Sequence, residues 1–417
     1  MRLNKLKLSD KKEMKILALG GSGDMGRMAV AVLLESSNLT SITVADKNYE
    51  RASHLVDLIE SDKLEATKID VTETNKLIEL ISSHDIVVNT VGPFYKFATM
   101  ILDAVIKAGK PYVDICDDWK PTLELLERNE KAKQAGITAV IGIGASPGIT
   151  NLMAVLACSK LDEIDDLITA WGYGIGERVG TKPKYFIDAR KFYQKFKDET
   201  AIANAATMHL FYESVDAIPT FREGKMIDIK PLTDAEPLQF PGFKDTNVCH
   251  IGHPEPITLP RVLKVKSVSN LMYMGETLTN MVRKYTQNIS NKELTVGEAS
   301  VKFTEETRSI RRTDDIVKEF IGMPPSLSVI AIGTKDGSRR KVAIANNRVP
   351  YGAMAGVTSV PLAIATQMVM NKDIKEKGVL TPEEAFIDPM EFFNRYAKYC
   401  GNNLSGNDVL LIKEVEL

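Results

Sequence analysis

The segment KILALGGSGDMG, residues 15–26, joins a short apolar run to a glycine loop, and an Ala- and Val-rich stretch follows at once. In a strand–loop–helix unit of this kind, Gly21 permits a tight turn, Gly23 lets the backbone approach a pyrophosphate, and Gly26 lets the helix pack on the strand. The N-terminus of the helix adds free N–H groups and a partial positive charge. The segment therefore predicts a dinucleotide-binding unit. Its candidate cofactor contacts are the loop residues Gly21, Ser22, Gly23, Asp24, Met25 and Gly26.

An acidic residue stands where such a unit needs one. Asp46 ends the apolar run SITVAD, 20 residues beyond Gly26, where a carboxylate can accept hydrogen bonds from the adenosine ribose. The alternative is a Gly-rich turn followed by a surface aspartate. Asp46 would repel a 2′-phosphate, whereas Lys47 and Arg51 could neutralise one. We therefore expect NAD as the cofactor, with NADP as the alternative.

Short apolar runs and helical stretches alternate from Met14 to Pro147 and provide six strand candidates. Strict alternation favours right-handed βαβ units and a parallel sheet. The expected fold class is α/β, with a doubly wound Rossmann sheet over residues 14–147. Beyond it the segments lengthen and a second domain of α+β type is expected. It includes a β-hairpin at the turn KDGS, residues 335–338, and helices over AGVTSVPLAIATQMVMNK and PEEAFIDPMEFFNRYAKYCG.

Three further strand ends carry polar or turn-forming residues. Ligands of open α/β sheets lie outside the carboxyl ends of the strands, so these segments are expected to border one crevice. For Gly92, Pro93 and Phe94 a simple turn is the alternative, and for Asp117 and Asp118 it is a cap on the following helix. The segments are VGPF (residues 91–94), DICDD (114–118) and SPG (146–148).

The bulk properties are those of an ordinary globular protein. The chain has 417 residues and a formal charge of -2, which provides no field for nucleic acid or an anionic membrane. Four scattered cysteines without a CxxC pair argue against a disulfide framework and favour reduced thiols in a cytoplasmic protein. The basic start, residues 1–13, lacks the apolar stretch of a signal peptide, and we expect a solvated extension there.

The segments GGSGDMG, VNTVGPF, YVDICDD and GASPGITNLMA, in this order, resemble the saccharopine dehydrogenase-like family, which includes lysine 6-dehydrogenase and carboxynorspermidine dehydrogenase-type enzymes. The resemblance continues through FREGK, HPEPITLPR and GVLTPEEAF and spans most of the chain. It implies that residues of about 350–417 complete the Rossmann domain and that 148–349 form a substrate and dimerisation domain. It also implies hydride transfer at a carbon–nitrogen bond of an amino acid or related amine, and assembly as a homodimer.

Hydride transfer to or from nicotinamide needs a group that manages the amine proton. Asp117 and His253 are the candidate catalytic residues, the latter because histidine has a reference pKa of about 6.5, near neutrality, and an acid stands close to it in the sequence. Asp118 could hold a substrate ammonium, while the helix N-terminus at Pro147 and Gly148 could receive a carboxylate. Arginines suit carboxylates too, and we select Arg261 from a group that also contains Arg190, Arg222 and Arg348.

The segment VCHIGHPEP is a candidate metal site, because Cys249, His250, His253 and Glu255 offer ligand atoms. Because this HxxH lies in a Pro-rich loop and hydride transfer needs no metal, we expect none. Two other functions stay open: a dinucleotide-binding regulatory or scaffold protein without turnover, and a Rossmann reductase of another substrate class.

Overall fold

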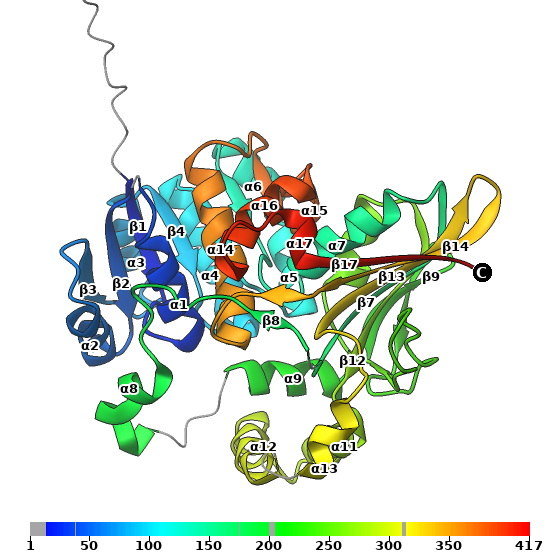
Figure 1. The fold of residues 1–417 in the computed structure, drawn as a ribbon. Coiled ribbons are helices and arrows are strands. Elements are labelled where there is room, and N and C mark those ends of the chain that lie inside the picture. The colour runs from blue at the N-terminus through cyan, green and yellow to red at the C-terminus, as the bar shows by residue number, and fades with distance from the viewer. Residues whose placement is uncertain (1–13, 38, 175, 200–204, 311–313) are drawn as a thin grey trace, which may run out of the picture.

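The computed structural model describes residues 14–37, 39–174, 176–199, 205–310 and 314–417, which form two β-sheets with helices around them (Figure 1). The expected extension at residues 1–13 lies outside the described residues. Within them, no helix has both the length and the apolar character that crossing a bilayer requires. All four cysteines are free and buried.

The first sheet has seven strands, all parallel, in the order β16-β6-β5-β4-β1-β2-β3. Reversal of the strand order on either side of β1 is the doubly wound arrangement, so the expected α/β Rossmann class is confirmed. The strands are β1 (Met14–Leu19), β2 (Leu39–Asp46), β3 (Leu64–Lys68), β4 (Ile86–Asn89), β5 (Tyr112–Asp114), β6 (Thr138–Val140) and β16 (Gly378–Leu380).

Alternate residues of β1 explain why helices cover both faces. Ile16 and Ala18 join the hydrophobic core on one face, whereas Leu17 and Leu19 join the core on the other. The first face is covered by α1 (Asp24–Leu33), α2 (Tyr49–Ile59) and α14 (Met354–Met370). The second is covered by α3 (Thr74–Ser82), α4 (Phe94–Ala108), α5 (Trp119–Leu126) and α6 (Asn129–Gln134).

The second sheet has eight strands, with the order β10-β9-β12-β7-β13-β14-β17 and β11 paired to β12. Only the β12–β7 pair among these is parallel, so the sheet is mixed. The expected hairpin is present, and Asp336 and Gly337 take the positive φ angles of its tight turn. The strands are β7 (Glu163–Gly172), β9 (Ile218–Arg222), β10 (Lys225–Ile229), β11 (Cys249–His250), β12 (Val265–Tyr273), β13 (Leu327–Lys335), β14 (Ser338–Asn346) and β17 (Leu410–Glu416).

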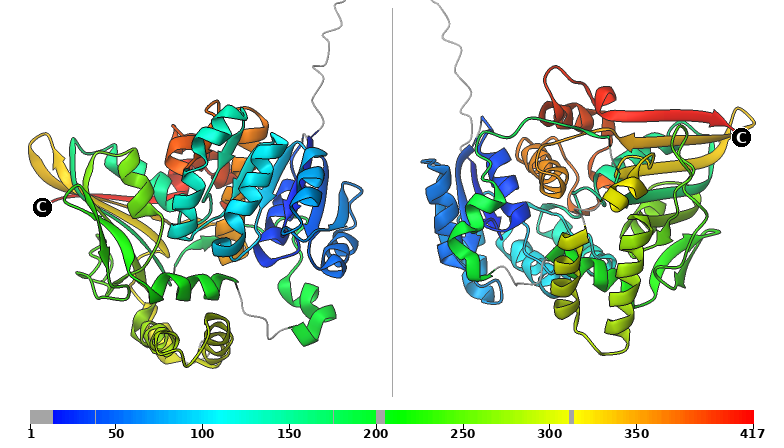
Figure 2. Two further views of the ribbon diagram at one scale, coloured as in Figure 1. Left: turned by 180° about the vertical axis from the view of Figure 1, so that it is seen from behind. Right: turned by 60° about the horizontal axis from the view of Figure 1, so that its bottom comes forward.

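Helices of the second part lie at both sides of this sheet (Figure 2). One group shares a hydrophobic core below it: α9 (Ala205–Val215), α11 (Gly275–Ser290) and α12 (Val296–Ile310), with α13 (Asp314–Phe320) beside them. The others are α7 (Ile149–Cys158), α8 (Ala189–Tyr193), α10 (Glu255–Thr258), α15 (Pro382–Ala385), α16 (Pro389–Cys400) and α17 (Gly406–Val409). Two short strands, β8 (Arg178–Val179) and β15 (Arg348–Val349), pair with each other.

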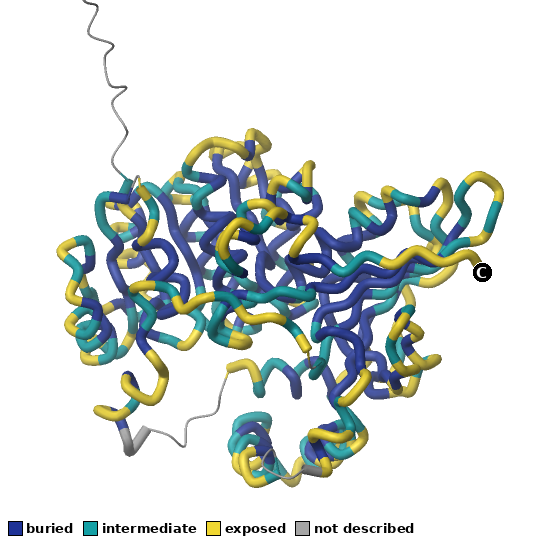
Figure 3. Tube along the Cα trace, in the orientation of Figure 1, coloured by how far each residue is buried: buried dark blue, intermediate teal, exposed yellow. Residues whose placement is uncertain are grey.

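The C-terminal residues divide between the two sheets. Helix α14 packs on α1, and β16 pairs with β6 at the edge of the first sheet. The last strand, β17, instead pairs with β14 in the second sheet. Buried residues run continuously from the first sheet through α7 and α14 into the second sheet (Figure 3). The chain therefore crosses between the two parts several times, and they share a core.

We predict that Gly26→Ala destabilises the protein by about 1–3 kcal/mol, the usual cost of overpacking. A Cβ at Gly26 would lie 2.3 Å from the carbonyl oxygen of Gly20, which is backbone and cannot rotate away. Gly297→Ala is the matched control, because the nearest atom to its Cβ would be 4.0 Å away. Urea denaturation measures both free energies of unfolding; an unchanged value for Gly26→Ala would contradict the prediction.

Candidate active site

The loops that follow the parallel strands converge at one edge of the first sheet. Thr90, after β4, bonds through its hydroxyl to the carbonyl oxygens of Leu19 and Gly20, both at 3.1 Å. Asp114 of β5 accepts hydrogen bonds from the N–H groups of Cys116 at 2.9 Å and Gly142 at 2.8 Å. These bonds join the loops after neighbouring strands, as their positions at parallel carboxyl ends require.

The glycine loop has the shape that a dinucleotide phosphate needs. A Cβ added to Gly23 would meet only the Gly20 carbonyl within 4 Å, at 3.2 Å, so the Gly23 backbone borders open space. Gly23 is also the N-cap of α1, whose first N–H groups have no partner within the helix. The residues present therefore fit a phosphate at this loop, through the loop backbone and the N-terminus of α1.

Both carboxylate oxygens of Asp46 accept hydrogen bonds within the protein. Its Oδ2 accepts a hydrogen bond from the hydroxyl of Ser22 at 2.5 Å, and its Oδ1 accepts one from the N–H of Asn48 at 3.0 Å. Beside it lies a broad, open hollow of about 850 Å³. The hollow is lined by Asp46, Lys47, Asn48, Tyr49, Glu50, Arg51 and Lys68, of which three are basic.

The expected cofactor contacts at the end of β4 divide between the crevice and the core. Gly92 lies against the start of α9, since its Cβ would be 3.3 Å from the Cβ of Ala205. Pro93 is the N-cap of α4. Phe94 is 7% exposed and packs in the core beneath the sheet. Of the three, Phe94 is thus placed to support the loop through packing.

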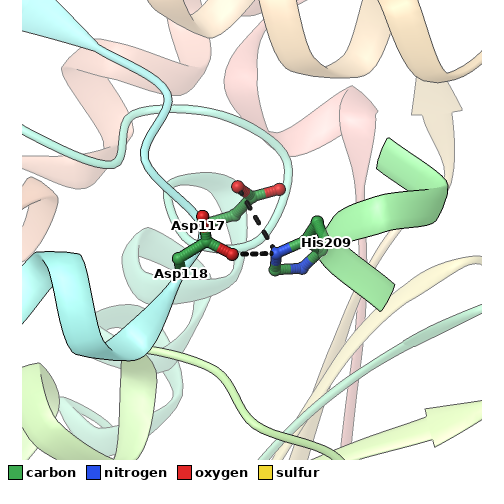
Figure 4. A group of neighbouring side chains, drawn as sticks. All are labelled: Asp117, Asp118 and His209. Atoms are coloured by element: carbon green, nitrogen blue, oxygen red, sulfur yellow. Dashed lines mark hydrogen bonds and ion pairs between the residues drawn. The ribbon is translucent and has the colours of Figure 1, made fainter. Parts of the chain in front are cut away.

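An acid–imidazole cluster lies where α9 meets the loop after β5 (Figure 4). The Nδ1 of His209 is 2.6 Å from Oδ1 of Asp118 and 3.7 Å from Oδ1 of Asp117. The side chains of Asp118 and His209 are 3% and 12% exposed, whereas that of Asp117 is 35% exposed. Asp117 is therefore the most exposed member of the cluster.

The charged groups of this cluster shift one another's pKa values. Burial opposes a charge on His209, but Asp117 and Asp118 outweigh it and raise the pKa of the imidazole to about 10. Burial raises the pKa of the Asp117 carboxyl, against the opposing effect of His209. At neutral pH His209 is thus a cation, and burial favours the neutral form of Asp117 more than is usual for an aspartate.

A second acid–imidazole pair faces the first. The Nδ1 of His253 is 2.9 Å from Oε2 of Glu255, and the two imidazole ring centres of His253 and His209 are 5.4 Å apart. Glu255 also accepts hydrogen bonds through Oε1 from the hydroxyls of Ser146 at 2.5 Å and Thr150 at 2.8 Å. Although burial opposes its charge, His253 and these bonds lower the pKa of Glu255, so its carboxylate orients His253.

Tyr95, Glu213 and Trp171 lie beside these two acid–imidazole pairs. Tyr95 of α4 donates a hydrogen bond to Oε1 of Glu213 at 2.8 Å. Glu213 is fully buried, its Oε2 has no hydrogen-bond partner among the described protein groups, and burial raises its pKa well above the usual value. The indole ring of Trp171 lies 5.7 Å from the His253 ring, with its N–H bonded to Asn270. Burial therefore favours the neutral form of Glu213, which is bonded to Tyr95.

The structure thus places most of the expected catalytic and substrate-binding residues near one another. Contacts run from Asp118 to His209, His253, Glu255 and on to Ser146, beside Pro147 and Gly148. Sequence reasoning missed His209 and Glu213 of α9, and Tyr95. The one available signal was their spacing: His209 and Glu213 are four residues apart and so share one face of an apolar helix.

Two expected carboxylate anchors are placed otherwise. The N–H of Gly148 is bonded to Oδ1 of Asn151, and the N–H groups of Ile149 and Thr150 are bonded to backbone carbonyls. The helix N-terminus after Pro147 is therefore already satisfied. Arg261 is 43% exposed and pairs with Glu384 at 3.4 Å, and no contact joins it to the cluster.

The candidate metal ligands of VCHIGHPEP are bonded to different neighbours. Cys249 bonds to the backbone of Met272, and His250 lies 3.4 Å from Arg222. In the part of the chain that the structure covers, the group with metal-ligand geometry is Asp117, Asp118 and His209, whose ligand atoms lie within 4.8 Å of one another. Its 2.6 Å contact between His209 and Asp118 is a charge-assisted hydrogen bond, which a cation would have to break.

We predict that Gly23→Val weakens dinucleotide binding by about 100-fold or more, because the branched side chain fills the space where a phosphate approaches the backbone. Calorimetric titration with the reduced dinucleotide measures the affinity. A circular dichroism melt shows that the variant is folded. Unchanged affinity in a folded variant would refute the phosphate-loop assignment.

We also predict that His209 stays protonated to about pH 10. Because its pKa in the folded state lies above the ordinary value of 6.5, the stabilisation is fully present below pH 6.5 and is lost as the pH rises through about 10. NMR titration of the imidazole signals measures this directly. His54 is an internal control, because burial lowers its pKa. Titration of His209 near pH 6.5 would contradict the prediction.

The comparisons with known proteins agree with this geometry. Residues 16–140 match the family model of the saccharopine dehydrogenase NADP-binding domain, and residues 144–401 match the saccharopine dehydrogenase C-terminal domain. Carboxynorspermidine synthase of Vibrio cholerae is 24% identical over 90% of this chain and 93% of its own. Carboxyaminopropylagmatine dehydrogenase of Synechocystis is 22% identical over 88% of this chain and 92% of its own.

The fold is shared with a solved structure as well. Apo saccharopine dehydrogenase (L-Glu forming) of Saccharomyces cerevisiae superposes with a TM-score of 0.61 at 15% identity, over 97% of this chain and all of that one. The C-terminal family model alone spans more than half of the 417 residues. The chain belongs to the saccharopine dehydrogenase family and is a nicotinamide-dependent oxidoreductase of the class that acts at carbon–nitrogen bonds.

Proposed function

We propose that the protein is an NADPH-dependent enzyme that reduces an imine to a secondary amine, or performs the reverse oxidation, on a polyamine-like substrate with a further cationic nitrogen. The observation that carries this proposal is the excess of carboxyl groups around His209 and His253. The bound dinucleotide supplies the hydride, and the protein supplies charge, orientation and a path for the amine proton.

The choice of NADPH differs from the expectation of NAD. That expectation relied on Asp46 facing the ribose, but both oxygens of Asp46 accept hydrogen bonds from Ser22 and Asn48. In the lining of the hollow beside it, the bases Lys47, Arg51 and Lys68 outnumber the acids Asp46 and Glu50, which favours a 2′-phosphate. The family model for residues 16–140 is that of an NADP-binding domain. These observations together support NADPH.

The balance of charge supports a cationic substrate. Asp117, Asp118, Glu213 and Glu255 face only two imidazoles, His209 and His253. Even with Glu213 left out as a neutral acid, the three carboxyl groups of Asp117, Asp118 and Glu255 outnumber the two imidazoles. A buried surplus of negative charge costs free energy unless a cation compensates it. A substrate ammonium or iminium beside Asp117 would provide that compensation.

The placement of the expected carboxylate anchors supports the same substrate. Arg261 pairs with Glu384 at the surface, and the N-terminus of α7 is closed by Asn151 and backbone carbonyls. These groups offer few positive charges or free hydrogen-bond donors to a substrate with several carboxylates. Two relatives are named for carboxynorspermidine and carboxyaminopropylagmatine, which are derivatives of amines with more than one nitrogen.

Two groups are suited to handle the amine proton. Asp117 is accessible, and its raised pKa lets it exchange a proton with the substrate nitrogen. The Nδ1 of His253 contacts the Glu255 carboxylate, so its Nε2 can accept or donate a proton. We propose Asp117 as the group in contact with the substrate nitrogen and His253 as the second proton-transfer group. Trp171 beside His253 helps to keep water away.

A cytoplasmic location and a homodimer remain part of this proposal. Four free, buried thiols are compatible with a reducing compartment. The assembly is proposed by analogy with the family, and sedimentation of the purified protein would measure it.

The test is an absorbance assay of NADPH consumption with one amino-acid aldehyde paired in turn with diamines, triamines and glutamate. We expect the value of kcat/KM for the polyamines to exceed that for glutamate by about 10-fold or more, which corresponds to about 1.4 kcal/mol. Turnover with glutamate but not with the polyamines would refute the substrate class. Binding of NADPH without turnover of any pair would favour the scaffold alternative.

In the same assay, Asp117→Asn should raise KM for the amine by about 10–100-fold, the usual worth of a hydrogen bond to a charged group. The dissociation constant of NADPH should change by less than about twofold, because the two sites are independent in their contacts. Asp216→Asn, at an exposed aspartate just after α9, is the control. An equal loss of affinity for amine and NADPH would argue against a substrate contact at Asp117.

A further inference from the structure

A short helix from the second part of the chain packs on the first two βα units. Helix α8 follows β7 and β8 and reaches back to α1 and α2, far from the second sheet (Figures 1 and 2). Its last two residues, Phe192 and Tyr193, make the contacts. Phe192 is fully buried there, so this packing is part of the fold.

The hydroxyl of Tyr193 joins the two ends of the candidate cofactor site. It accepts a hydrogen bond from Nη2 of Arg51 at 3.0 Å and donates one to Oδ1 of Asp24 at 3.1 Å. Asp24 lies in the glycine loop, and Arg51 lines the basic hollow beside Asp46. One side chain of the second part thus contacts both the phosphate loop and the hollow.

The neighbouring cations are arranged around the same two rings. The guanidinium of Arg27 lies 4.3 Å from the ring centre of Phe192 and pairs with Asp24 at 2.8 Å. The guanidinium of Arg51 lies 5.3 Å from the ring centre of Tyr193. Cation–π contacts of this kind fix the plane of a guanidinium. Arg27 is only 3% exposed and belongs to the packing, whereas Arg51 borders the hollow.

We infer that Tyr193 is a positioning residue for the adenosine 2′-phosphate: its hydroxyl and ring hold the Arg51 guanidinium at the edge of the hollow, where it binds that phosphate. This inference rests on the proposed use of NADPH. A free arginine loses much rotamer freedom when it binds an anion, and a guanidinium held in place loses less. Helix α8 thereby contributes to the preference for NADPH over NADH from outside the Rossmann sheet.

The test uses the full chain and fluorescence titration with NADPH and with NADH. Tyr193→Phe removes the hydroxyl and keeps the ring, and Arg51→Gln removes the charge. The two are also combined. Tyr185→Phe, a partly buried tyrosine in the same segment, is the matched control. Thermal melts of all variants show that each is folded.

We expect Tyr193→Phe to weaken NADPH by about 3–10-fold, the worth of one hydrogen bond, and NADH by less than about twofold. Arg51→Gln should weaken NADPH by about 10–100-fold, as loss of a charge-assisted bond does. Once Arg51 is replaced, Tyr193→Phe should have no further effect on NADPH. Tyr185→Phe should leave both affinities unchanged.

Equal losses for NADPH and NADH in Tyr193→Phe would make Tyr193 merely structural and overturn the inference. Additive effects of Tyr193→Phe and Arg51→Gln on NADPH would overturn it too, because the hydroxyl would then act without the guanidinium. In both cases a wild-type preference for NADPH leaves the proposed function intact. A wild-type protein that binds NADH at least as tightly as NADPH contradicts the proposed cofactor and, with it, this inference.

Discussion

The buried ion pair between Asp118 and His209 is the constraint on which the site depends. Asp118 follows the carboxyl end of β5, His209 lies on α9, and their side chains are almost excluded from water. Two such groups are stable only when each compensates the other, and removal of one leaves an uncompensated charge at a cost of about 3–5 kcal/mol. The pair therefore fixes α9 over the end of the parallel sheet. Through α9 it also fixes Glu213, which bonds to Tyr95 of α4, so both ends of this helix face are attached to the first sheet.

The parallel sheet could be predicted because its strands are buried on both faces and its loops follow strict rules. The run KILALGG has continuous apolar character, and glycines stand where the loop backbone comes closest to itself. The strand β16 could not be found from periodicity, since it has three residues and its partner β6 lies more than 200 residues earlier. The charged stretch after β5 forms two helices, α5 and α6, with Glu127 and Arg128 between them. Tertiary contacts, absent from local patterns, decide such short elements.

The site was predictable to the extent that it sits on strand ends. Asp117 and Asp118 follow β5 directly, and topology alone places them at the edge where Gly23 lies. His209 gave no comparable signal, because a histidine in AATMHLFYESV looks like any residue of an amphipathic helix. Arg261, in contrast, was predicted as a site residue but does not lie at the site. Its residue type suited a carboxylate, but type does not determine direction, and the side chain turns to Glu384 at the surface. Residue chemistry narrows the candidates, and only the packing of α9 and α10 selects among them.

Two of the contacts that connect the second part of the chain to the first differ in their surroundings. At one end of the sheet edge, Asp118 and His209 meet in a nearly dry setting, where salt screens little. At the other, Tyr193 meets Asp24, whose side chain is 45% exposed, and Arg51 at the border of an open hollow. Exposed charges lose their attraction as ionic strength rises, whereas buried pairs keep it. The contacts of the acid cluster are therefore insensitive to salt, whereas the contacts beside the hollow weaken as the ionic strength rises. Such a division suits a protein that has to hold a reacting nitrogen in one place while a charged nucleotide enters and leaves.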